Sequence, residues 1–101
     1  LWVRLRDAAL SCPALKILGP TCDSVKRLAI LSFSVLCRGA GRDYFLHHNF
    51  VAALLNDLFG LQVRSGCMCA GPYALSLLGI EGDLAEAYEK ALLMGDELVR
   101  P

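Results

Sequence analysis

Two cysteines separated by one residue occur in the sequence RSGCMCAGPY, which covers residues 64–73. Cysteine thiolates are nucleophiles and metal ligands, and positive charge or a helix N-terminus nearby favours the thiolate. Arg64 comes three residues before Cys67, and Pro72 suits the first turn of a helix that follows the loop. The stretch therefore fits three kinds of site: a loop that presents one reactive thiol, part of a metal site, or a disulfide.

A metal site needs more ligands than this loop contains. Structural zinc takes four ligands, usually from two separated pairs. The other clustered candidates are His47 and His48, at the start of a predicted helix. The chain after that helix has room to run back along it and bring Cys67 and Cys69 near the histidines, but the spacing matches no known zinc motif. We expect no metal here, rank a Cys-x-Cys disulfide lower still, and interpret the histidines as residues that cap or flank the helix.

The composition indicates one domain that is partly covered by something else. The chain has 101 residues, and its ten basic and ten acidic residues cancel, which removes the main electrostatic support for nucleic-acid or anionic-membrane binding. A hydrophobic fraction of 55% is high for so small a unit, so we expect a partner or the rest of a longer protein to cover apolar surface. Spanning a membrane needs about 20 predominantly apolar residues, and no such run occurs. Five cysteines without the spacing of a disulfide framework favour the reducing cytoplasm.

Hydrophobic periodicity predicts an α+β fold, with a small antiparallel sheet of about three strands and helices packed on one face. Strands are expected at 15–18, 28–36 and 61–64, with a glycine-containing loop at 37–43. The second strand is predicted from alternation, because Ser32 and Ser34 oppose Phe33 and Val35. Helices are expected up to about Ser11, at about 47–59, in a short turn through Leu78, and at about 83–94.

The helix at about 47–59 is the element that leads to the cysteine loop. Phe50, Leu54 and Leu58 are expected to pack on the sheet, with Asn49 or Asp43 as the N-cap and Gly60 in a left-handed conformation at the end. The last helix is expected to bury a face that contains Leu84, Ala87, Tyr88 and Ala91.

Three segments together resemble a known family: RLAILSFSV (27–35), LHHNFVAALLNDLFGLQVRSGCMCAGPY (46–73) and LLGI (77–80). In this order they are similar to the C-terminal small domain of class V aminotransferases. These fold-type I enzymes depend on pyridoxal phosphate and include the cysteine desulfurases. The similarity runs from about Leu15 to Ile80 and is greatest to a cysteine-desulfurase-like branch. It implies an enzyme that acts on an amino acid.

The resemblance also implies roles for residues of the loop. In cysteine desulfurases an Arg-x-Gly-x-x-Cys loop carries the cysteine that forms a persulfide, which corresponds here to Arg64, Gly66 and Cys69. Cys69 is therefore the candidate catalytic nucleophile. Arg64 is the candidate for binding the substrate carboxylate, because an arginine can hold a carboxylate through two parallel hydrogen bonds. The alternative for Arg64 is a surface charge beside the end of a strand.

The cofactor is expected to bind outside this chain. In the family its lysine lies in the large domain within a Ser/His-Lys motif, and Lys16, Lys26 and Lys90 lack that context. We therefore expect a fragment that is inactive alone and belongs to a homodimeric parent enzyme, whose large domain is its partner. Two other interpretations stay open: a non-catalytic interaction domain that binds through its apolar surface, and a small Cys/His metal-binding module.

Overall fold

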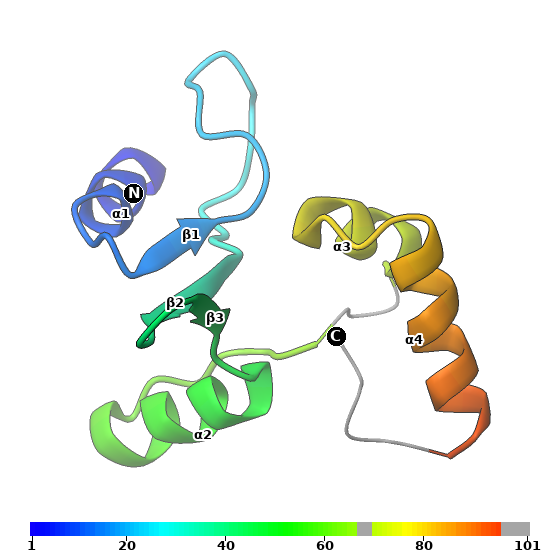
Figure 1. The fold of residues 1–101 in the computed structure, drawn as a ribbon. Helices are drawn as coiled ribbons and strands as arrows, with labels where there is room; N and C mark the ends of the chain where they lie inside the picture. The colour runs from blue at the N-terminus through cyan, green and yellow to red at the C-terminus, as the bar shows by residue number, and fades with distance from the viewer. Residues whose placement is uncertain (67–69, 96–101) are drawn as a thin grey trace. The chain divides into compact units, whose positions relative to one another are not determined.

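The computed structural model describes residues 1–66 and 70–95 (Figure 1). The elements, in chain order, are α1 (Trp2–Leu10), β1 (Leu15–Ile17), β2 (Phe33–Arg38), β3 (Asp43–Phe45), α2 (His48–Phe59), α3 (Gly71–Leu78) and α4 (Asp83–Leu93). They form two compact units, Leu1–Val51 and Ala52–Pro101, with the division inside α2. The predicted α+β class with a three-stranded antiparallel sheet is confirmed.

The sheet of the first unit is an antiparallel meander in the order β1-β2-β3. Leu15 lies opposite Val35 and Ile17 opposite Phe33, so these four side chains share one face. All four are half-buried. α1 packs beside β1, and its Ala9 is 4% exposed. It is the one buried side chain among residues 1–66 and 70–95.

The third strand lies in a different place from the one predicted. The predicted strand at 61–64 is absent, because residues 61–65 form no strand. The third strand is β3 (Asp43–Phe45), which begins at the last residue of the loop predicted at 37–43. Gly41 has φ +104°, which favours glycine, and the Gly39 N–H donates to the Arg42 carbonyl at 3.1 Å. The two glycines therefore close a hairpin. The predicted strand at 28–36 is correct only from Phe33 onward, and β2 continues to Arg38.

The hairpin has no space for a side chain at Gly39. A Cβ atom there would lie 2.9 Å from Tyr44 Cε2 and 3.1 Å from the Arg42 carbonyl oxygen. The Tyr44 ring is half exposed and able to move, but the carbonyl belongs to the backbone of the turn. We expect Gly39→Ala to lower the free energy of unfolding by about 1–2 kcal/mol in urea titrations. Gly71→Ala is the matched control, because a Cβ at Gly71 meets nothing within 4 Å. Equal stability of the two variants would contradict this packing.

Two arginines hold the long connection between β1 and β2 to α1. Arg6 donates to the Thr21 carbonyl at 3.2 Å and forms ion pairs with Asp7 and Asp23. The hydrogen bond to Asp7 is the main reason that the pKa of the Arg6 guanidinium is raised. Arg27 stacks on the Trp2 ring, with Cζ 3.6 Å from the ring centroid. Arg27 also donates to the carbonyls of Pro20, near the start of the connection, and of Ile30, near its end. One side chain therefore holds both ends of the connection.

α2 begins and ends largely as expected, and none of its residues is fully buried. Its start is capped by His47, whose Nδ1 accepts the Asn49 N–H at 3.3 Å, which confirms that this histidine caps the helix. The two predicted caps were wrong, since Asn49 lies inside α2 and Asp43 in β3. Gly60 has the expected left-handed conformation, with φ +63°.

The packing predicted for α2 was also wrong. Phe50, Leu54 and Leu58 are 56%, 40% and 67% exposed, whereas Val51 and Leu55 are half-buried. The reason is that α2 carries two adjacent apolar stripes one residue apart, and spacing alone does not distinguish them.

The second unit contains α3 and α4. Pro72 lies in the first turn of α3, as predicted, and Gly79 ends that helix with φ +74° while the Ile80 N–H donates to the Leu75 carbonyl at 2.9 Å. α4 ends at Leu93, one residue before the expected end. Its half-buried residues are Ala85, Tyr88 and Ala91, whereas the predicted Leu84 and Ala87 are exposed.

Much apolar surface stays exposed. Among the larger examples are Leu1, Leu28, Phe59, Leu93 and Met94, each at least two-thirds exposed. Within residues 1–66 and 70–95 there is no helix whose length and apolar character would let it cross a membrane.

Candidate functional site

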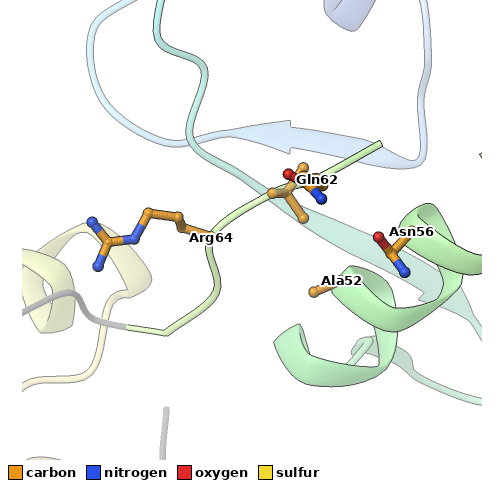
Figure 2. Close-up of a pocket in the computed structure, with 5 residues that line it drawn as sticks. Ala52, Asn56, Gln62 and Arg64 are labelled. Carbon is orange, nitrogen blue, oxygen red and sulfur yellow. The ribbon is translucent and has the colours of Figure 1, made fainter. Parts of the chain in front are cut away.

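A pocket of about 550 Å³ lies in the second unit, where the chain leaves α2 (Figure 2). Its lining consists of Ala52, Asn56, Gln62, Val63 and Arg64. Ala52 and Asn56 come from α2, and the other three come from the extended segment that follows it. In Figure 2 the Arg64 guanidinium lies at one end of this group, and Ala52 and Asn56 lie at the other. The pocket is therefore built from one helix and the chain that returns past it.

The end of α2 explains how these residues come together. Ala52 and Asn56 are four residues apart, so they share one face of the helix. After Phe59 the left-handed Gly60 turns the chain, and its N–H donates to the Asn56 carbonyl at 3.0 Å. The Leu61 N–H then donates to the Leu55 carbonyl at 3.1 Å. These two hydrogen bonds close the end of the helix and direct residues 62–64 to the face that carries Asn56.

The lining of the pocket contains one charged side chain, an arginine. Arg64 is the one charged residue of the lining, and no carboxylate of residues 1–66 and 70–95 forms an ion pair with it. Asn56 donates one hydrogen bond from Nδ2 to Asp57 Oδ1 at 3.1 Å, and Gln62 contributes a second amide. A guanidinium suits a carboxylate because both groups are planar, although in Figure 2 the Arg64 guanidinium extends away from Gln62 and Asn56.

The structure describes only part of the predicted loop. Arg64 lines the pocket, and Gly66 has φ +83°, a conformation that requires glycine or strains another residue. Cys67 and Cys69 lie outside the described residues, so the nucleophilic role of Cys69 stays a prediction. Sequence reasoning missed Asn56 and Gln62. The available signal was an amide on the apolar helix, one turn before the glycine that ends it.

The three described cysteines, Cys12, Cys22 and Cys37, are free thiols. The Ser24 hydroxyl donates to Cys22 Sγ at 3.2 Å, and this hydrogen bond lowers the pKa of the Cys22 thiol. In the part of the chain that the structure describes, no three His, Cys, Asp or Glu side chains gather as a metal site would need. His47 and His48 lie at the start of α2 and do not line the pocket.

No family model, curated protein or solved structure matches the chain.

Proposed function

We propose that this chain is the small domain of a pyridoxal-phosphate-dependent enzyme of the class V aminotransferase type, similar to the cysteine desulfurases. In this role it supplies Arg64 to bind the carboxylate of an amino-acid substrate, and Cys69 as a thiol nucleophile. The observation that carries the proposal is the pocket in which Arg64 stands with Asn56 and Gln62, free of any acidic lining residue. Such a pocket suits a carboxylate, the group that all α-amino acids share.

The described residues do not fit the cofactor itself. The family's lysine would have to stand beside the substrate site, but Lys16, Lys26 and Lys90 do not line the pocket and are all exposed. Lys16 lies in β1, with its Nζ 5.4 Å from the ring centroid of Phe45. We therefore assign the cofactor to a large domain outside this chain and derive no step through it. The chain alone is proposed to be inactive, within a parent enzyme that is a homodimer.

Two further parts of the proposal concern setting and partners. The free thiols Cys12, Cys22 and Cys37 support a reducing, cytoplasmic setting. The exposed apolar side chains support a large protein surface that covers this chain in the parent enzyme. We propose no nucleic-acid partner, because the charges of the chain cancel.

The same exposed side chains favour a second candidate, a non-catalytic interaction domain. Apolar side chains as exposed as Leu28 and Phe59 are typical of surfaces that another protein covers. An interaction domain needs neither an anion-binding arginine nor a reactive thiol. Carboxylate binding at Arg64 and selective reactivity at Cys69 therefore separate the two candidates.

The thiol role predicts unequal reactivity of two neighbouring cysteines. Cys69 is expected to react with iodoacetamide faster than Cys67 at neutral pH, because a presented nucleophile is accessible and its thiolate is stabilised by Arg64 and by the start of α3. Mass spectrometry would follow each site across pH, with and without zinc. Arg64→Ala is expected to slow the reaction of Cys69, and zinc to leave it unchanged. Equal rates at both sites that zinc suppresses together would favour a metal module instead.

A further inference from the structure

The two units carry opposite net charge, although the charges of the whole chain cancel. Residues Leu1–Val51 contain seven basic and three acidic side chains, which gives a net charge of +4. Residues Ala52–Pro101 contain three basic and seven acidic side chains, which gives a net charge of −4. This separation gives each unit an attraction for the oppositely charged unit of a second copy of the chain.

The first unit exposes apolar side chains on the long connection between β1 and β2. Val25, Leu28 and Ile30 are 44%, 75% and 61% exposed. The connection is nevertheless fixed: the Leu18 N–H donates to the Ser32 carbonyl at 2.8 Å across its base, and the two arginines described above hold it to α1. A fixed loop with exposed apolar side chains suits docking, because little conformational entropy is lost when a partner binds.

The exposed part of this connection is positively charged. Lys26 lies between Val25 and Leu28, is exposed, and forms no ion pair with an acidic side chain of residues 1–66 and 70–95. The one acidic residue of the connection, Asp23, is already paired with Arg6. The surface therefore suits a partner that is both apolar and acidic.

α4 presents a surface of this kind. Its half-buried residues are Ala85, Tyr88 and Ala91, so the opposite side of the helix faces solvent. That side carries Glu86 and, two turns later, Leu93, which is 81% exposed. Among the residues that the structure describes, no acidic side chain of α4 is in an ion pair.

We propose that two copies of this chain form a dimer in which α4 of each copy docks on the β1–β2 connection of the other. A two-fold arrangement makes the contact twice and uses both surfaces of both copies, so the assembly closes. The contact covers exposed leucines on both sides and places Glu86 in the field of Lys26. This association does not rest on the proposed enzyme function, because it uses no residue of the pocket lining.

Sedimentation velocity of the whole chain tests the dimer. The wild type is expected to dimerise at about 0.1 M salt and to have a roughly tenfold higher dissociation constant at about 1 M, because the Debye length falls from about 10 Å to about 3 Å. Lys26→Glu and Glu86→Lys each reverse one charge of the contact, so each is expected to weaken the dimer by about tenfold. Arg42→Glu and Asp57→Lys are the matched controls, which make the same changes of charge in the same units outside both surfaces, and they are expected to dimerise like the wild type.

A mixture of two variants shows whether the contact joins different copies. Equimolar Lys26→Glu and Glu86→Lys chains are expected to regain the wild-type affinity, because one contact of the mixed dimer pairs the two reversed charges and the other pairs the two original ones. A wild type that stays monomeric up to about 0.5 mM, where even a weak transient interface associates, would overturn the proposal. Controls that weaken the dimer as much as Lys26→Glu and Glu86→Lys do, or a mixture as weak as its components, would also overturn it.

Discussion

Arg27→Ala is expected to lower the free energy of unfolding of the first unit by about 2–4 kcal/mol. Two hydrogen bonds from a charged group to backbone carbonyls contribute about 1.5–3 kcal/mol each, and a cation–π contact adds about 0.5–2 kcal/mol. Trp2 Nε1 and Arg27 Nε are buried without partners, and this cost offsets part of the gain. The net loss in free energy of unfolding is still large, because one guanidinium contacts the Trp2 ring and the carbonyls of Pro20 and Ile30.

The chain provides its own probe for this prediction. Trp2 is the single tryptophan, and Arg27 lies on its ring, so its fluorescence reports the cluster directly. Urea titrations are expected to show a lower midpoint and a red-shifted native emission for Arg27→Ala. Arg27→Lys keeps a cation over the ring but loses the planar guanidinium, so its urea midpoint is expected to lie between those of the wild type and Arg27→Ala. Arg4→Ala, an exposed arginine of α1, is the control. Identical midpoints and emission for Arg27→Ala and Arg4→Ala would show that the cluster does not hold the connection.

The second large effect is expected at the pocket. Arg64→Gln should weaken the binding of L-alanine by roughly 10- to 100-fold, because the variant loses a charge-assisted pair of hydrogen bonds worth about 1.5–3 kcal/mol. Asn56→Ala and Gln62→Ala remove neutral donors, so smaller losses of roughly 2- to 10-fold are expected. Isothermal titration calorimetry at high protein concentration suits the affinity expected for a single carboxylate, about millimolar.

The control for this series is Arg4→Gln, which makes the same chemical change at a residue that does not line the pocket. It separates a local effect from the change in net charge. Equal losses in Arg64→Gln and Arg4→Gln would mean that binding reflects general electrostatics. In that case the pocket would have no part in it.

Sequence patterns predicted the elements best where a strong local signal set them. The helices at 48–59 and 71–78 are each followed directly by a glycine with positive φ, and Pro72 lies in the first turn of the second, so these residues restrict the backbone directly. β3 was not predicted, because three residues that begin with an aspartate show no alternation. It exists because β2 continues to Arg38 and the turn at 39–42 returns the chain beside it. Such short strands form because they pair with a neighbouring strand, and local periodicity in the sequence does not show that pairing.

Of the residues that line the pocket, the sequence analysis named Arg64 and did not name Asn56 or Gln62. Arg64 was selected because it precedes the cysteine loop, and it lines the pocket. Asn56 and Gln62 were missed because their proximity depends on the turn at Gly60, which brings the segment after α2 back past the helix. Residues 61–64 alternate like a strand but have no sheet partner among the described residues.

The measurement that tests the proposed function most directly is an NMR titration of the whole chain with L-alanine, L-alaninamide and ethylamine. The amide keeps the size and ammonium group of the amino acid and lacks its carboxylate. We expect saturable shifts at Asn56, Gln62 and the Arg64 Nε–H with L-alanine, and none with the other two ligands. Shifts with L-alaninamide equal to those with L-alanine, or no saturable shift at these three residues, would contradict a carboxylate-binding role for Arg64.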